Sequence, residues 1–131
     1  MPIWNTHDLE FDVDAVLRGQ GAEPQAIRKR SPRLVETAER ALEEGRALIK
    51  PQTLYRELDV DLLRHERLIL DDGQTLSGTL VADHLGPAQR VVLILSTIGV
   101  DLEAHAAEIS KDDIVYGLAL DGVGSAAVEA L

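Results

Sequence analysis

Two short glycine-containing segments near the carboxyl end hold the side chains best suited to binding chemistry. The first is Ser96-Thr97-Ile98-Gly99, and the second is Gly122-Val123-Gly124-Ser125-Ala126-Ala127. Glycine lets the backbone approach another group closely, and hydroxyl groups beside it can form hydrogen bonds. The second segment also has the G-x-G-x-x-A spacing with which a strand-to-helix turn receives a pyrophosphate. These residues therefore predict a close backbone contact, either with a ligand or with a neighbouring helix.

The pyrophosphate interpretation depends on the secondary structure of residues 114–120. A strand there would place the glycines at a strand-to-helix turn, whereas one helix over residues 114–131 would make them contact points for another helix. The G-x-G-x-x-A pattern is weakly specific, and the acidic residue expected about 20 positions later would lie beyond Leu131. We favour the helix, in which Gly117, Asp121 and Gly124 share one face.

No other group of polar residues forms a recognisable catalytic or metal motif. His105 has Asp101 and Glu108 at helical spacing, but a catalytic zinc site needs three protein ligands and an open position. The sequence contains no cysteine, and no serine lies in a G-x-S-x-G elbow. We therefore predict no catalytic residue and no metal ion.

The charge of the chain argues against nucleic acid as a partner. The net charge is −10, which repels phosphate backbones. The only dense basic stretch is Arg28-Lys29-Arg30 with Arg33. We interpret it as a solvated helix end, with a docking site for an acidic partner as the alternative.

Length and composition indicate one cytoplasmic domain. The chain has 131 residues, of which 45% are hydrophobic, and this suits a single domain with its own core. The first residues have neither the basic start nor the apolar length of a secretory signal. The longest apolar run, residues 91–95, is far shorter than the ~20 residues that cross a bilayer. We expect no membrane partner.

Periodicity predicts a helical part in residues 1–50 and a mixed part in residues 51–131. The first part contains a short helix at residues 12–18 and a long helix that begins after a capping Ser31 and ends at Pro51. The second part contains extended segments at residues 53–58, 67–70 and 74–76, a strand buried on both faces at 91–95, and helices capped by Ser77 and Asp101.

Five segments follow one another in an order and spacing that is typical of one known family. They are Val16-Leu17-Arg18, Ile49-Lys50-Pro51 with Leu54-Tyr55-Arg56, His84-Leu85-Gly86, Ser96-Thr97-Ile98-Gly99, and residues 120–129. Over most of its length the chain thus resembles the activation domain of cobalamin (vitamin B12)-dependent methionine synthase. The resemblance implies an α/β (α+β) fold in one domain over residues 1–131, with helices packed around a largely antiparallel twisted sheet.

The resemblance also implies a role. In this family the activation domain binds S-adenosylmethionine and docks over the cobalamin module, so that oxidised cobalt, reduced through a flavodoxin-like protein, is remethylated. The chain would then be an accessory protein of corrinoid methyl transfer that meets cobalamin only through a corrinoid-binding protein or methionine synthase modules. The family's R-x-x-x-G-Y signature for S-adenosylmethionine does not occur up to Leu131. We therefore expect the family's C-terminal region to be missing and the cofactor site to be partial.

Six residues are the predicted ligand contacts: Thr97, Gly99, Asp121, Gly124, Ser125 and Glu129. The glycines would allow backbone approach, the hydroxyls would form hydrogen bonds, and the carboxylates would meet an amine or hydroxyl group. Two alternatives stay open. One is a non-catalytic docking domain for a corrinoid protein, and the other is a nucleotide-binding enzyme fragment built on the G-x-G-x-x-A loop.

Overall fold

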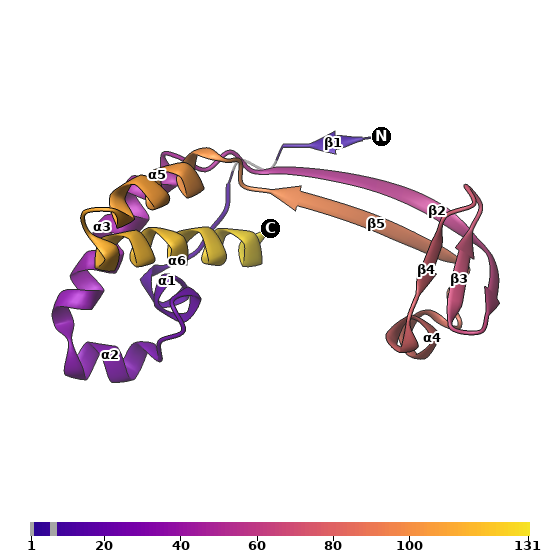
Figure 1. Cartoon of the computed structure of the whole chain (residues 1–131), viewed down its shortest axis with the longest axis horizontal. Helices are drawn as coiled ribbons and strands as arrows, with labels where there is room; N and C mark the ends of the chain where they lie inside the picture. Colours follow the sequence, from indigo (N-terminus) through magenta and orange to yellow (C-terminus); the bar gives the residue numbers. More distant parts are fainter. Residues whose placement is uncertain (1, 6–7) are drawn as a thin grey trace. The chain divides into compact units, whose positions relative to one another are not determined.

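The computed structural model describes residues 2–5 and 8–131. Within these residues the fold is mixed α+β, with six helices and a five-stranded, largely antiparallel open sheet (Figure 1). The chain divides into two compact units. The sheet unit comprises Met1–Ile3 and Leu54–Leu95, and the helical unit comprises Trp4–Thr53 and Ser96–Leu131. The predicted α+β class is confirmed, while a single domain over residues 1–131 stays a prediction.

The helical unit is built around one long apolar helix near the carboxyl end. This helix, α6 (Ile114–Ala130), contacts α1 (Val13–Gly19), α3 (Pro32–Arg46) and α5 (Asp101–Ser110). Its buried side chains include Leu120 and Val123, both fully buried, which meet Val16 and Leu17 of α1 in one core cluster. A fifth helix, α2 (Pro24–Arg30), packs against α3. The prediction of a helix over residues 114–131 is therefore confirmed.

Small residues allow α1 and α6 to approach each other closely. A Cβ atom added at Gly122 would lie 2.7 Å from Gln20 Cγ and 2.8 Å from the carbonyl oxygen of Val16. From the other side, a Cβ atom added at Gly19 would lie 2.6 Å from the carbonyl oxygen of Gly122. Neither space admits a methyl group without moving backbone, so both helices depend on glycine at this crossing.

The sheet unit contains a long central strand, two hairpin strands and a short helix. Strand β2 (Gln52–Arg64) pairs with β3 (Arg67–Leu70), which pairs with β4 (Thr75–Ser77); β5 (Arg90–Thr97) and β1 (Ile3–Trp4) also pair with β2. Both the β2–β3 and the β3–β4 pairs are antiparallel. The core consists of Leu58, Leu68, Leu70 and Val91, against which Val81 and Leu85 of α4 (Thr79–Leu85) pack.

The β2–β3 hairpin was not predicted. Strand β2 continues to Arg64 and turns through His65 and Glu66, whose φ angles are 51° and 62°. Two-residue hairpin turns of this kind usually contain Asn-Gly or Asp-Gly, because those residues tolerate positive φ. The sequence His-Glu gives no such signal, so the extended segment was predicted to stop at residue 58. The β3–β4 hairpin, with its Asp71-Asp72-Gly73 turn, was predicted correctly.

Several predicted helix ends and caps were wrong. Helix α2 was not predicted, α3 ends at Arg46 rather than at Pro51, and Ser31 makes no capping hydrogen bond. Ser77 lies in β4, and Gly78 precedes α4 instead. Asp101 does not cap α5, because the helix already begins at Asp101 and Val100 occupies the N-cap position; the Asp101 carboxylate forms an ion pair with Lys50 at 2.6 Å. By contrast Asp12 caps α1, where it accepts a hydrogen bond from the Ala15 amide.

The strand predicted at residues 91–95 is present, but it is not buried on both faces. Val91 is 7% exposed and faces the core of the sheet unit. Val92, Ile94 and Leu95 are 49%, 66% and 71% exposed. The prediction failed because an uninterrupted aliphatic run does not distinguish a covered strand from one with an open face.

The close approach of α1 and α6 can be tested by adding one methyl group. Gly122→Ala should lower the free energy of unfolding by about 1–3 kcal/mol, the usual cost of overpacking. Gly124→Ala is the matched control, because its Cβ atom would meet Ile98 and Leu102 at an ordinary 3.6 Å. Alanine there should gain up to about 1 kcal/mol of helix propensity. Urea denaturation measures both, and equal stability of the two variants would contradict the packing described.

Candidate functional site

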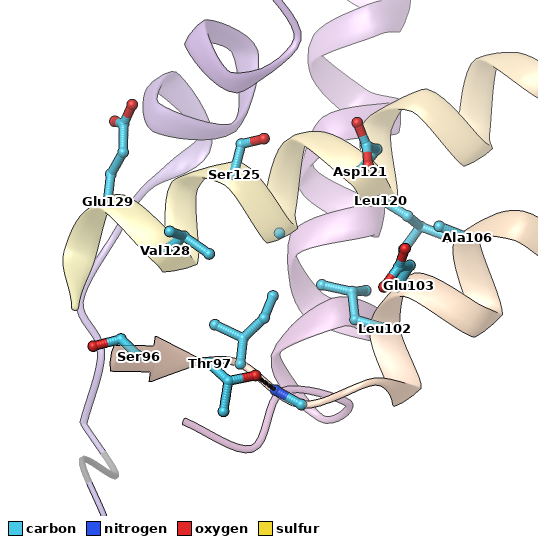
Figure 2. Close-up of a pocket in the computed structure, with 13 residues that line it drawn as sticks. Ser96, Thr97, Leu102, Glu103, Ala106, Leu120, Asp121, Ser125, Val128 and Glu129 are labelled. Carbon is cyan, nitrogen blue, oxygen red and sulfur yellow. Dashed lines mark hydrogen bonds between the residues drawn. The ribbon is translucent and has the colours of Figure 1, made fainter. Parts of the chain in front are cut away.

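A cavity of about 570 Å³ lies in the helical unit among α5, α6 and residues 96–99 at the end of β5 and just beyond it (Figure 2). All six predicted contact residues line it: Thr97, Gly99, Asp121, Gly124, Ser125 and Glu129. The two glycine-containing segments, more than 20 residues apart in the sequence, therefore meet at one place. Its volume falls within the range of about 300–1,000 Å³ that is typical of small-molecule sites.

The cavity has an apolar floor and a polar rim. Leu102 and Ala106 of α5 and Leu120 of α6 form the floor, and all three are buried. Thr97, Asp121, Ser125 and Glu129 are exposed and form the rim. In Figure 2 the side chains of Val128 and Leu102 lie between the ribbons, whereas Ser125 and Glu129 point to the side of α6 away from Thr97. A ligand would rest an apolar face inside and keep its polar groups near solvent.

A tight turn shapes one edge of the cavity. The Thr97 hydroxyl oxygen accepts a hydrogen bond from the Gly99 amide at 3.0 Å, and Gly99 has a φ of +83°. Glycine adopts this backbone conformation without the steric cost that a side chain adds. On the far side of the turn, the Lys50 amide donates to the Ile98 carbonyl at 2.7 Å. Thr97 and Gly99 thus position the edge, and the Thr97 hydroxyl keeps its own proton available to a ligand.

The rim of the cavity is acidic. Three carboxylates line it, those of Glu103, Asp121 and Glu129, and none of the lining residues is a lysine, arginine or histidine. Opposite charge on a ligand lowers its energy near such a rim, and like charge raises it. The site therefore favours a ligand that carries positive charge. Glu103 was missed from the sequence, because only the packing of α5 against α6 brings it near Asp121.

A second polar cluster ties the two cavity helices to α3. The carboxylate of Glu44 accepts hydrogen bonds from the Tyr116 hydroxyl of α6 and from Nε2 of His105 on α5. The guanidinium carbon of Arg40 lies 4.8 Å from the centre of the Tyr116 ring. One carboxylate thereby links three helices, at a point that the cavity does not touch. This cluster could not be predicted from the sequence, because the partners lie 61 and 72 residues from Glu44.

These contacts shift two pKa values in opposite directions. The hydrogen bond from Tyr116 lowers the pKa of Glu44 below its usual 4.5, and His105 and Arg40 act in the same direction against the effect of burial. Burial raises the pKa of Tyr116 to about 12, and the Glu44 carboxylate adds to the rise. Glu44 is therefore the acceptor and Tyr116 the donor over the physiological pH range.

The pyrophosphate interpretation of the G-x-G-x-x-A segment is wrong. It required a strand at residues 114–120, and these residues form the first two turns of α6. Gly122 and Gly124 lie inside the helix, where backbone amides are engaged in helical hydrogen bonds and cannot cradle a phosphate. Gly122 instead contacts α1, as described above.

Two comparisons, with protein-family models and with curated proteins, find nothing similar to this chain. No protein-family model matches the chain, and a search of curated proteins also finds none.

Among residues 2–5 and 8–131, no three His, Asp or Glu side chains are grouped so that they could hold a metal ion. The helices in that part of the chain are all too short or too polar to cross a membrane. The chemistry of the site therefore rests on its own geometry.

The link through Glu44 predicts a pH-dependent loss of stability. Glu44→Gln should lower the free energy of unfolding by about 1 kcal/mol at neutral pH, below the roughly 1.5–3 kcal/mol of a fully buried hydrogen bond to a charged group. Solvent screens this carboxylate, whose side chain is 40% exposed. Because the pKa of Glu44 is lower in the folded state, its contribution is complete above about 4.5 and disappears as the pH falls through the folded-state value.

The difference between wild type and Glu44→Gln should therefore shrink below pH 4.5 in urea titrations. Glu43→Gln provides the control, since Glu43 is the preceding residue and forms none of the ion pairs found among the described residues. A difference that stays constant down to the acid transition would show that the carboxylate is not the stabilising group.

Proposed function

We propose that this chain is an accessory protein of corrinoid-dependent methyl transfer that binds S-adenosylmethionine in the α5–α6 cavity. The observation that carries the proposal is the assembly of all six residues that were predicted from the sequence around one cavity. The proposal includes a fold like that of the methionine synthase activation domain, with helices packed around the sheet. It also includes a cytoplasmic location.

The chemistry of the cavity supports this ligand. S-adenosylmethionine carries two positive groups, a sulfonium and an ammonium, and one carboxylate. Asp121 could accept a hydrogen bond from the ammonium or from a ribose hydroxyl, and the buried floor could pack against the adenine ring. No cation lines the cavity to meet the ligand's carboxylate, so that group would face solvent.

In this role the chain performs no chemistry itself. A corrinoid-binding protein or the modules of methionine synthase would hold cobalamin, and a flavodoxin-like protein would supply the electron. The chain would present S-adenosylmethionine as the methyl donor to the reduced cobalt.

The second candidate function is docking to a corrinoid protein without a ligand. Its support is the exposed apolar surface of α6 beside the cavity, where Leu118 is 56% and Val128 is 53% exposed. Exposed aliphatic side chains next to a polar rim are common in protein interfaces. In this case the cavity would be filled by a side chain of the partner rather than by a cofactor.

Calorimetry with S-adenosylmethionine distinguishes the two functions. We expect measurable heat of binding for wild type and an affinity about tenfold lower for Asp121→Ala, because one charge-assisted hydrogen bond is lost. Asp112→Ala, which removes an exposed carboxylate outside the cavity, should leave the affinity unchanged. S-adenosylhomocysteine lacks the sulfonium charge and should bind more weakly.

Two results would contradict ligand binding. Absence of heat with the folded wild-type protein would favour docking alone. Binding that Asp121→Ala and Asp112→Ala leave equally strong would place the ligand outside the α5–α6 cavity.

A further inference from the structure

A compact basic surface lies at the junction of α2 and α3, in an otherwise acidic chain. Arg28, Lys29 and Arg30 form the last turn of α2, and Arg33 lies in the first turn of α3. Residues 24–35 contain these four cations and no carboxylate, although the whole chain has a net charge of −10. The four residues are called the basic surface below. The cavity in the same unit is lined by none of them.

Most of the basic surface has no internal partner. Arg28 forms an ion pair with Asp14 of α1. The charged groups of Lys29, Arg30 and Arg33 take part in none of the ion pairs or hydrogen bonds found among residues 2–5 and 8–131, and all three residues are exposed. Their positive charge is therefore available to another molecule.

Helix electrostatics explain only part of this arrangement. Cations in the last turn of a helix are stabilised by the helix dipole, typically by 0.3–1 kcal/mol each, which accounts for Arg28, Lys29 and Arg30. Arg33 lies at the opposite, positive end of α3, where a cation is disfavoured. It also repels the neighbouring cations of α2. Arg33 therefore gains nothing from the dipole of α3, and its position fits an external function.

The surroundings favour a protein over a nucleic acid as the partner. The basic surface spans six residues of sequence, whereas a nucleic acid extends its charge over a longer path and would meet acidic surface beyond it. The aromatic residues that could stack on bases, Trp4, Phe11, Tyr55 and Tyr116, all lie elsewhere in the sequence. Leu34, which follows Arg33, is 37% exposed and adds an apolar contact of the kind that protein interfaces use.

We propose that the basic surface, with Leu34 beside it, docks a complementary acidic surface of a partner protein. Arginine favours this use, because its planar group can bind a carboxylate through two hydrogen bonds. The attraction would raise the rate of association and orient the partner on the α2–α3 side of the helical unit. This proposal does not depend on S-adenosylmethionine binding, and either can fail alone.

Fluorescence anisotropy with labelled poly-L-glutamate tests the proposal. We expect the wild-type protein to bind at low salt despite its negative net charge, and binding to weaken as salt screens the charges. In the triple variant Lys29→Glu, Arg30→Glu and Arg33→Glu, the affinity should fall by about tenfold or more. The matched control, Arg64→Glu, Arg67→Glu and Lys111→Glu, changes the net charge equally at exposed positions and should bind much like wild type.

Circular dichroism is the check that both triple variants are folded. If the three charge reversals disturb α3, Arg33→Gln removes one positive charge with a smaller change. If both triple variants lose binding equally, net charge alone explains the loss, and the proposal is overturned. A single-stranded oligonucleotide of equal charge that binds more tightly through the same residues would overturn it in favour of nucleic acid.

Discussion

The helical unit depends on how closely its other helices can approach α6. At the crossing of α1 and α6, glycines from both helices face each other, and each occupies a space too small for a methyl group. On another face of α6, a Cβ atom on Gly45 of α3 would lie 2.8 Å from Val123. With three helices so close, the core contains mainly alanine, valine and leucine, and Tyr116 is its only buried aromatic side chain among the described residues. Water is therefore excluded from this core by the close packing of the helices rather than by large aromatic side chains.

The same packing determines where the cavity lies. With α1 and α3 against α6, the side of α6 that carries Asp121 and Val128 stays exposed and lines the cavity. The Thr97 to Gly99 turn approaches this side, and α5 closes the floor with Leu102. Away from the cavity, Glu44 of α3 is hydrogen-bonded to His105 of α5 and to Tyr116 of α6. The binding surface is thus formed by parts that the rest of the unit holds in place.

Periodicity was sufficient to predict most of the helices, while small-residue spacing together with the family resemblance selected the residues of the candidate site. The apolar pattern of residues 114–131 favoured a helix, and the side chains predicted to bind fell around one cavity once that helix packed against α5. Features that depend on tertiary contact could not be predicted. The left-handed turn at His65 and Glu66 is imposed by strand pairing, and the exposure of Ile94 reflects what packs against the strand rather than its own hydrophobicity. Asp101 has the right type for a cap but binds Lys50 instead.

The helical unit is discontinuous in the sequence, because the chain leaves it after Thr53 and returns at Ser96. Helices α1, α2 and α3 are synthesised first, yet their apolar faces lack the helix against which they pack until α6 emerges. Closing the intervening segment costs conformational entropy, which grows slowly with loop length and is smaller once that segment has itself become compact. Early formation of the β2–β3–β4 hairpins, whose contacts are local, would therefore bring the two halves of the helical unit within reach and set the order of folding.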